Sequence, residues 1–275
     1  MIGIVVLGAT GRMGRRICRM VIEDEELELV GAIASPTSEH LGRDVGLLIG
    51  VGETGVEIAP PAALPNIAKD ADVAIDFTVR EATLENAPKA AHAGLDLVIG
   101  TTGFRGEDLR MLEHEIEEAG VSAVISANMS LGVNLLFELT RQLARVLGNN
   151  GFDFEIVEIH HRHKVDAPSG TALELAAVIE EELGKEKKVF GREGNVGPRD
   201  DDEIGVLAVR GGEVVGDHTV MALGEHERIE LTHRALSRDA FAKGALVAAK
   251  FVVEAPPGIY SMRDVLFGGK REEGL

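Results

Sequence analysis

The chain has 275 residues, of which 45% are hydrophobic, and its formal net charge at pH 7 is −18. This length and composition are typical of a globular protein with one large domain or two modest ones. The acidic balance argues against an extended nucleic-acid surface, and no apolar run approaches the roughly 20 residues of a membrane-spanning helix.

The single cysteine and the first residues bear on location. Cys18 lies in a predicted helix, where it is expected to be a small buried hydrophobe rather than a reactive thiol. One cysteine excludes an internal disulfide framework, and the start of the chain lacks the basic region of a signal peptide. We therefore expect a cytoplasmic protein.

The first 130 residues alternate short apolar runs with longer helical patterns. Predicted strands cover 2–7, 27–33, 72–76, 95–100 and 121–126, and predicted helices cover 12–23, 80–93 and 106–119. Buried strands that alternate with helices of this size indicate βαβ units and a parallel, twisted sheet. The sequence therefore predicts a Rossmann-like α/β domain.

The first predicted turn, GATGRMG, places Gly8, Gly11 and Gly14 between a strand and a helix. Glycines there let the backbone approach a pyrophosphate, which the N–H groups at the start of the helix can bind. The spacing is one residue off the commoner dinucleotide fingerprint, so a turn needed only for packing stays an alternative. Its position after the first strand favours dinucleotide binding.

The end of the second predicted strand bears on which dinucleotide is bound. A carboxylate usually stands there to hold the ribose hydroxyls of NAD, but this chain has Ser35. No charge then repels a 2′-phosphate, and Arg12 at the start of the adjacent helix can reach one. The alternative, open for Arg12 and favoured for Arg15 and Arg16, is that these side chains only face solvent.

Three later turns also follow predicted strands. They are Asp76-Phe77-Thr78, GTTG at 100–103 and SANMS at 126–130. In an open parallel sheet, ligands lie beyond the carboxyl ends of the strands, so we expect all three turns at one edge. They could line the nicotinamide ribose, and ordinary turn chemistry is the alternative for each.

After a predicted helix at 131–147 the pattern changes. Predicted strands follow at 154–161, 204–210, 213–223 and 227–235, and Gly211-Gly212 indicates a two-residue hairpin. Consecutive strands favour an antiparallel or mixed sheet, hence a second α+β domain at 131–238. A helix that starts near Asp239 could return to the first domain, which would then comprise 1–130 and 239–275.

Residues 158–172 read EIHHRHKVDAPSGTA, a run of basic residues that leads from a strand end into a helix. Thr171 and Glu174 have capping-box spacing, so the N–H groups of Gly170 and Thr171 should form an anion site. With His161 and Lys164 nearby, this favours a small molecule with carboxylates. An imidazole and an ammonium can also hand over protons near neutral pH.

Metal binding by His160, His161 and His163 is disfavoured, because neighbours on an extended strand point to opposite faces. No HExxH or CxxC motif completes a site. We therefore expect no bound metal. Simple exposure of the basic residues at a strand end is the other alternative, and His163 is the first candidate for a bystander.

Several motifs occur together and in a fixed order. They are GATGRMGR, DFT at 76–78, GTTGF at 100–104, SANMSLGVN at 126–134, EIHHRHKVDAPSGTA, VGDHTVMALGEHERIELTHRA and MRDVL at 262–266. Over nearly its whole length the chain resembles the dihydrodipicolinate reductase family, also called 4-hydroxy-tetrahydrodipicolinate reductases, of lysine and diaminopimelate biosynthesis. HHRHKVDAPSGTA is highly specific to that family, whereas the glycine loop is not.

The resemblance implies a two-part fold whose last helix returns to the nucleotide domain, and a homotetramer assembled through the sheets of the second domain. The implied reaction is reduction of a cyclic unsaturated dicarboxylate to tetrahydrodipicolinate by NADPH or NADH, with loss of water from the hydroxylated substrate. His160 would be the catalytic histidine and Lys164 the proton donor. His161, Gly170 and Thr171 would contact the substrate. Implied cofactor contacts are Gly8, Ala9, Thr10, Gly11, Arg12, Met13, Gly100, Thr101, Thr102, Ser126, Ala127, Asn128 and Met129, and the end of the second strand adds Ser35.

Ser35 departs from the family's common pattern, in which an acidic residue stands at this position, so strong NADH preference is in doubt and dual use stays open. Residues 191–205 read as a loop with no assigned role. Two other functions remain alternatives: another NAD(P)-dependent dehydrogenase of similar architecture, and a non-catalytic NAD(P)-sensing protein. A thioester-forming aldehyde dehydrogenase would need a nucleophilic cysteine, for which Cys18 is badly placed. A sensor has little reason to keep His160 and Lys164 beside an anion site.

Overall fold

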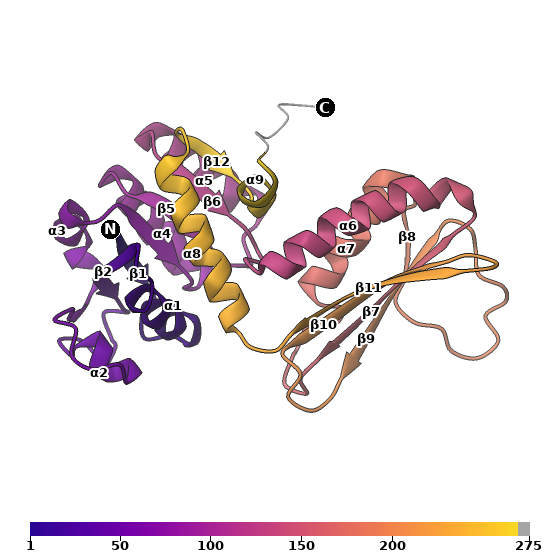
Figure 1. Cartoon of the computed structure of the whole chain (residues 1–275), viewed down its shortest axis with the longest axis horizontal. Coiled ribbons are helices and arrows are strands. Elements are labelled where there is room, and N and C mark those ends of the chain that lie inside the picture. Colours follow the sequence, from indigo (N-terminus) through magenta and orange to yellow (C-terminus); the bar gives the residue numbers. More distant parts are fainter. Residues whose placement is uncertain (269–275) are drawn as a thin grey trace. The chain divides into compact units, whose positions relative to one another are not determined.

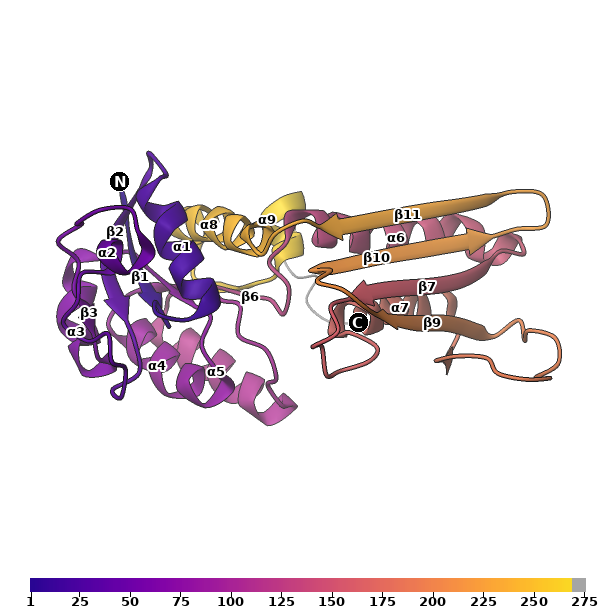
Figure 2. The same cartoon turned by 90° about the horizontal axis from the view of Figure 1, so that it is seen from below.

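The computed structural model describes residues 1–268, which divide into two compact units (Figures 1 and 2). One unit contains Met1–Leu131 and the chain from Asp239 onward, and the other contains Gly132–Arg238. In the described part of the chain, no helix combines the length and hydrophobicity that crossing a lipid bilayer requires.

The first unit is built on a parallel sheet of seven strands in the order β12-β6-β5-β4-β1-β2-β3. The strands are β1 (Ile2–Leu7), β2 (Leu27–Ile33), β3 (Ile58–Ala59), β4 (Val73–Asp76), β5 (Asp96–Ile99), β6 (Ser122–Ile125) and β12 (Gly258–Tyr260). The prediction of a parallel Rossmann-like sheet is confirmed. Its five predicted strands are all present, whereas β3 and β12 have no counterpart in the prediction.

Helices cover both faces of this sheet. They are α1 (Arg12–Ile22), α2 (Val45–Ile49), α3 (Leu64–Ile67), α4 (Arg80–His92), α5 (Gly106–Ala119), α8 (Asp239–Glu254) and α9 (Met262–Phe267), with 3-10 turns η1 (Pro61–Ala63) and η2 (Ala68–Asp70). Side chains alternate along β1, so that Ile4 and Val6 pack with α1 and α8, while Val5 and Leu7 pack with α4 and α5.

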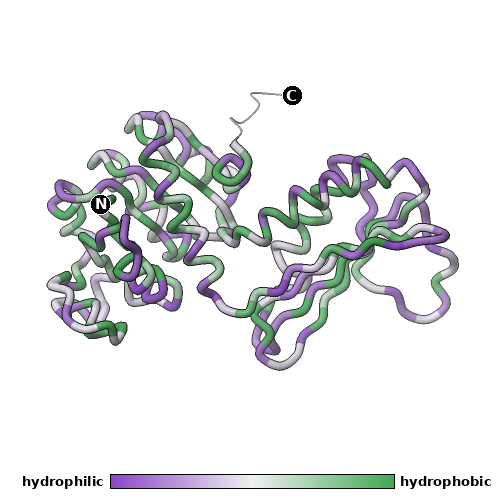
Figure 3. The backbone as a smooth tube through the Cα atoms, viewed as in Figure 1, coloured by the Kyte–Doolittle hydropathy of each residue, from purple (hydrophilic) through white to green (hydrophobic). Residues whose placement is uncertain are grey.

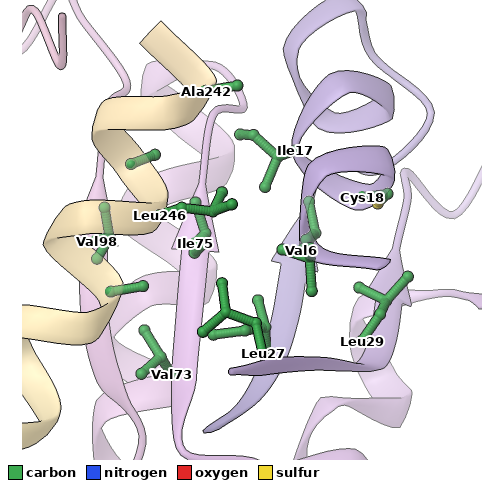
Figure 4. Packing of buried hydrophobic residues seen from close by; sticks show 14 of the residues in the cluster. Val6, Ile17, Cys18, Leu27, Leu29, Val73, Ile75, Val98, Ala242 and Leu246 are labelled. Carbon is green, nitrogen blue, oxygen red and sulfur yellow. The ribbon is translucent and has the colours of Figure 1, made fainter. Parts of the chain in front are cut away.

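The last long helix belongs to the first unit, as the resemblance implied. Leu246 of α8 lies beside Ile17 of α1 over the sheet (Figure 4). Cys18 is fully buried in the same cluster, and burial raises the pKa of its thiol to about 12. The interpretation of Cys18 as a core residue is therefore confirmed.

The second unit is a mixed sheet of five strands in the order β11-β10-β7-β9-β8. The strands are β7 (Asp153–His160), β8 (Lys187–Val189), β9 (Glu203–Arg210), β10 (Gly216–Leu223) and β11 (Arg228–Ala235). β7 is parallel to β9 and antiparallel to β10. Two helices, α6 (Leu131–Leu147) and α7 (Gly170–Leu183), pack on one face of this sheet, and η3 (Gly148–Asn150) follows α6 (Figure 2).

The strands of the second unit alternate between hydrophobic and hydrophilic residues (Figure 3). Phe154 and Ile156 of β7 and Val220 of β10 point toward α6 and α7 and form the core. Residues of odd number on β7 point to the opposite face, so β7 places one set of side chains under the helices and another on the open face.

The prediction of a two-residue hairpin at Gly211-Gly212 is wrong. β7 lies between β9 and β10, so the connection between those strands passes the end of β7. The backbone N–H of His161 donates to the carbonyl of Val214 at 2.8 Å, and that of Gly211 donates to the carbonyl of His160 at 3.0 Å. Local turn chemistry identified a turn here, but long-range pairing with β7 decides which strands are neighbours.

Candidate active site

The glycine loop joins β1 to α1 in a conformation that depends on its glycines. Gly8 has a φ of +82°, in the left-handed region that favours glycine. A Cβ atom at Gly14 would lie 2.0 Å from the carbonyl oxygen of Gly8, so the start of α1 packs directly on the loop. Gly11 precedes the helix without a side-chain cap. Arg12 and Met13 therefore begin a helix whose N-terminus favours an anion such as a pyrophosphate.

The three arginines of α1 have different surroundings. Arg12 is exposed. The Nε of Arg15 donates to the carbonyl of Thr10 at 2.8 Å, and a terminal nitrogen of Arg15 lies 3.3 Å from Nε2 of His40. Arg16 pairs with Asp239 at 2.5 Å. The interpretation of Arg15 as an arginine that only faces solvent is therefore wrong, because its side chain is held by Thr10 and His40. The side chain of Arg16 is 40% exposed and faces solvent while it pairs with Asp239.

Ser35 follows β2 and is exposed, and its hydroxyl lies 3.0 Å from that of Thr37. Arg15 reaches the same segment through His40. The segment after β2 thus presents hydroxyls and an imidazole beside a guanidinium. Sequence reasoning missed Arg15 and His40, because nothing in the pattern shows how the segment folds back on α1.

The turns after β4 and β5 meet, as expected for neighbouring parallel strands. Oδ1 of the buried Asp76 accepts from the N–H of Thr78 at 2.8 Å and from the hydroxyl of Thr101 at 3.3 Å. Burial raises the pKa of Asp76, although these hydrogen bonds oppose the change. A Cβ at Gly100 would lie 2.2 Å from the ring of Phe77, so the two turns pack closely.

The remaining expected cofactor residues differ in exposure. Thr102 and Ala127 are exposed, whereas Thr101 is buried in the Asp76 network. The backbone N–H of Ser126 donates to the carbonyl of Ile99, which ties the turn after β6 to β5. The side chain of Met129 lies in the core, so this residue can offer a ligand only its backbone.

In the second unit, His160 is the last residue of β7 and is 8% exposed. Its Nδ1 lies 2.6 Å from a carboxylate oxygen of Glu158, which is fully buried. Glu158 also accepts from Arg210 at 2.7 and 2.8 Å and from the N–H of Ser169 at 3.0 Å. Burial alone would raise the pKa of Glu158, but Arg210, His160 and Ser169 together lower it. The carboxylate is therefore ionised beside the imidazole.

A second imidazole packs against His160. The rings of His160 and His218 meet edge-on with centroids 5.2 Å apart. Burial lowers the pKa of His218 to about 4, so this ring is neutral at pH 7. Burial also lowers the pKa of His160, and the carboxylate of Glu158 offsets only part of this effect.

Lys164 follows in the turn after β7. Its Nζ lies 2.8 Å from a carboxylate oxygen of Asp166, and its side chain is 20% exposed. The charge of Lys164 lies close enough to His160 to lower the pKa of that imidazole further. The turn that carries Lys164 closes on the neighbour of His160, since the backbone N–H of Lys164 donates to the carbonyl of His161 at 3.1 Å.

The capping residue of α7 is Ser169, not Thr171, so the predicted capping box of Thr171 and Glu174 is wrong. The Ser169 hydroxyl accepts from the N–H of Ala172 at 3.2 Å, and the helix begins at Gly170. Serine fits the extended backbone that precedes a helix. Gly170 and Thr171 become the first two residues of α7, where backbone N–H groups and the helix dipole favour an anion.

The three histidines after Glu158 do not converge. His160 is buried against His218, whereas the side chain of His163 is 70% exposed and lies 3.7 Å from Glu213. The rings of His161 and His163 have centroids 6.2 Å apart. Among the described residues, ligand atoms gather with metal-like spacing only on α4 and α5, at the exposed His92 and Glu118 and the half-buried Glu115.

Sequence reasoning missed Glu158, Arg210 and His218. Glu158 had a signal, because a residue two positions before His160 on a strand shares its face. His218 lies in the quoted motif VGDHTVMALGEHERIELTHRA, but no pattern places it or Arg210 beside His160, since that proximity depends on β9 and β10 pairing with opposite sides of β7.

A Rossmann-like unit with a glycine loop, joined in one chain to a unit with a buried carboxylate and imidazole and a nearby ammonium, is typical of an NAD(P)-dependent oxidoreductase. Two family models cover nearly the whole chain: dihydrodipicolinate reductase, N-terminus, at residues 2–129, and dihydrodipicolinate reductase, C-terminus, at residues 132–266. The chain belongs to the dihydrodipicolinate reductase family and is an NAD(P)H-dependent oxidoreductase of lysine and diaminopimelate biosynthesis.

Individual relatives agree with this membership. The 4-hydroxy-tetrahydrodipicolinate reductase of Methanopyrus kandleri is 94% identical over 100% of both chains. That of Methanothermobacter thermautotrophicus is 48% identical over 97% of this chain and 99% of the relative. A dipicolinate-bound dihydrodipicolinate reductase from Paenisporosarcina sp. TG-14 shares the fold, with a TM-score of 0.77 at 24% identity over 97% of this chain and 100% of that chain.

Proposed function

We propose that the chain reduces 4-hydroxy-tetrahydrodipicolinate to tetrahydrodipicolinate, with the first unit binding NAD(P)H and the second binding the substrate. The observation that carries the proposal is the link from the buried His160, through Glu158, to Ser169 at the N-terminus of α7, with Lys164 in the turn between β7 and that helix. A cyclic dicarboxylate needs anion donors and a proton source, and this part of the second unit offers both.

The first unit fits a dinucleotide. The close packing of Gly14 on Gly8 brings the start of α1 against the glycine loop, which places the first N–H groups of the helix where a pyrophosphate would bind. In the proposal, Gly8 to Met13 hold the pyrophosphate. Gly100 to Thr102 and Ser126 to Met129 line the nicotinamide end, where Thr101 and Met129 contribute through their backbones. When bound, the cofactor supplies a hydride.

In the second unit, His161, Gly170 and Thr171 bind the substrate carboxylates. Reduction of the electron-poor ring leaves negative charge that a cation stabilises and a proton quenches. Lys164 supplies both, and it exchanges its contact with Asp166 for one with the substrate. The Nδ1 of His160 is occupied by Glu158, so His160 exchanges protons with a ligand through Nε2.

Turnover tests the function directly. The purified chain is mixed with 4-hydroxy-tetrahydrodipicolinate and NADPH or NADH, cofactor oxidation is followed by absorbance, and the product is identified by mass spectrometry. Production of tetrahydrodipicolinate supports the proposal. Reduction of NAD+ or NADP+ with an aldehyde or an amino acid as the only substrate that is turned over would indicate another dehydrogenase. Cofactor binding without turnover would indicate a sensor.

We also propose a homotetramer assembled through the open face of the second sheet. Side chains that alternate away from α6 and α7 include the apolar Val157, Val209 and Met221, and Val209 is 46% exposed. Sedimentation of the wild type and of a Met221→Lys variant tests this assembly.

We further propose a cytoplasmic location, where a free cysteine stays reduced.

A further inference from the structure

We propose that Glu158 is a positioning residue, because its one carboxylate binds the imidazole of His160, the N-terminus of α7 at Ser169, and Arg210, which holds the loop that carries Lys164. This inference rests on the proposed function. It extends that function from the groups that touch the substrate to the group that orients them.

The position of Glu158 is fixed by the fold. β7 is the central strand of the sheet, paired on both sides by β9 and β10, and Glu158 points toward the covered face with no exposed surface. An ionised carboxylate has about four acceptor sites. The four donors are Nδ1 of His160, two terminal nitrogens of Arg210 and the N–H of Ser169, at 2.6 to 3.0 Å. The four acceptor sites are therefore all occupied, by three residues that come from β7, β9 and the start of α7.

The contact with His160 decides where that imidazole carries its proton. An ionised carboxylate only accepts hydrogen bonds, so Nδ1 of His160 carries a hydrogen. Nε2 is then an acceptor in the neutral ring and a donor in the imidazolium. Glu158 thereby leaves Nε2 as the nitrogen that changes protonation.

Arg210 links Glu158 to the turn that carries Lys164. One terminal nitrogen of Arg210 binds Glu158 at 2.7 Å and also donates to the backbone carbonyl of Asp166 at 2.6 Å. The side chain of Asp166 in turn holds Lys164 at 2.8 Å. Removing the charge of Glu158 would free Arg210, and the turn that places Lys164 would lose its anchor to the sheet.

Charged and titratable groups reach His160 from each neighbouring element. Glu158 lies on β7, Arg210 on β9, His218 on β10, and Lys164 on the turn after β7. Of these, only Glu158 stabilises the imidazolium, whereas Arg210 and Lys164 repel it and His218 offers a neutral edge. Loss of the Glu158 charge should therefore move the titration of His160 to lower pH.

The test compares Glu158→Gln with Glu155→Gln. Glu155 lies on the same strand, is also buried, and is also bound by arginines, Arg192 at 2.9 Å and Arg199 at 3.1 Å, but it points to the opposite face. Titration of each histidine is measured by hydrogen–deuterium exchange at the imidazole C2 position with mass spectrometry, without substrate. The parameters kcat and KM are then measured against pH.

We expect Glu158→Gln to lower the pKa of His160 by about one pH unit and kcat by roughly 10²-fold. The limb of the pH profile that reports His160 should move to lower pH, and the KM for NADPH should not change. Glu155→Gln should leave the His160 titration and kcat near wild type. An unchanged His160 titration in folded Glu158→Gln would overturn the proposal, even if that variant is less stable.

Glu158→Asp is the variant to measure if Glu158→Gln does not fold. It keeps the charge but is one methylene shorter, so it should hold the His160 pKa closer to wild type while kcat still falls. Wild-type kcat in Glu158→Asp would show that the reach of the carboxylate to its partners does not matter, which contradicts the proposal.

The histidine titration separates this inference from the proposed function. It is measured without substrate, so it reports positioning of His160 even if the wild type does not reduce the dicarboxylate. Absence of wild-type turnover together with a shifted His160 pKa in Glu158→Gln would reject the proposed substrate and leave the positioning intact.

Discussion

A Cβ atom at Gly216 would stand 2.9 Å from Nε2 of His160. Gly216 is the first residue of β10, and its φ is not positive, so its backbone conformation is open to other residues. What excludes a side chain at this position is the imidazole. The glycine therefore keeps open the ring nitrogen that Glu158 leaves for a ligand.

Gly216→Ala should place a methyl group against Nε2 or push the ring aside. We expect kcat/KM for the dicarboxylate to fall about tenfold or more, as for other displacements of a positioned catalytic group. Gly211→Ala is the matched control, because a Cβ there meets nothing within 4 Å and its φ is also not positive. Equal kinetics for the two variants would contradict the assignment of Nε2 as the reactive nitrogen.

His160→Ala and Lys164→Ala should each lower kcat by roughly 10²-fold or more, in the range for losing a positioned acid or electrostatic partner. NADPH affinity, measured by calorimetric titration, should change little. His163→Ala serves as the control, because its side chain is 70% exposed and it should keep near-full turnover. If His160→Ala or Lys164→Ala keeps near-full turnover with a normal KM, the substituted residue is not catalytic.

Cofactor preference should follow Ser35 and the arginines of α1. We expect NADPH to be used at least as well as NADH, since Ser35 does not repel a 2′-phosphate. Ser35→Asp should shift the ratio of KM values toward NADH by about ten- to a hundredfold, the worth of a charge-assisted hydrogen bond of roughly 1.5–3 kcal/mol. Arg12→Ala and Arg15→Ala should weaken NADPH more than NADH.

Arg16→Ala is the control for the cofactor series, because Arg16 is held by Asp239 rather than by the segment after β2. It should leave the ratio of kcat/KM values for the two cofactors unchanged. If this ratio is also unchanged in Ser35→Asp, Arg12→Ala and Arg15→Ala, position 35 does not contact the ribose of the cofactor.

The protein should become less stable as the pH is lowered, because of His218. Its pKa is about 4 in the folded protein against 6.5 as the ordinary value, so between these values the unfolded chain binds a proton that the folded chain does not. The free energy of unfolding should therefore decrease as pH falls through this window, by roughly 3 kcal/mol from this residue. Guanidinium unfolding of the wild type and His218→Gln measures it: the variant should show a flatter pH dependence, and identical slopes would refute the prediction.

Dialysis against a chelator should leave activity intact, because the proposed reaction uses protein groups as proton donors. Metal content of the purified protein is measured by mass spectrometry before and after dialysis. Stoichiometric zinc, with activity lost on its removal and restored on its return, would contradict the prediction of no bound metal.

Much of the first unit could be predicted because buried parallel strands form continuous apolar runs bounded by turn residues. β1 and β2 have their predicted bounds of 2–7 and 27–33. β3 and β12 span two and three residues, which is too short for any periodic signal. They add to the sheet only because distant segments bring them to its edges.

The candidate site in the second unit was less predictable than the sheet of the first unit. His160 and Lys164 stand out by residue type in one short stretch, but the groups that orient them do not. Besides His160, the partners of Glu158 come from two other segments, β9 with Arg210 and the start of α7 with Ser169. Arg210 reaches Glu158 because β9 pairs with β7, whereas Gly211-Gly212 wrongly suggested that β9 pairs with β10. The predicted N-cap of α7, Thr171, differs from the observed one, Ser169, by two residues, because serine and threonine are both favoured at this position.

The first unit consists of two chain segments separated by the whole of the second unit. During synthesis on the ribosome, β1 to β6 emerge long before α8, which supplies Leu246 and its neighbours to one face of their sheet. In the second unit, Glu158 and His160 likewise emerge before Arg210 and His218. Neither unit can therefore reach its final packing until these later segments have been made, so the partly made chain exposes apolar surface that has to be kept from aggregating.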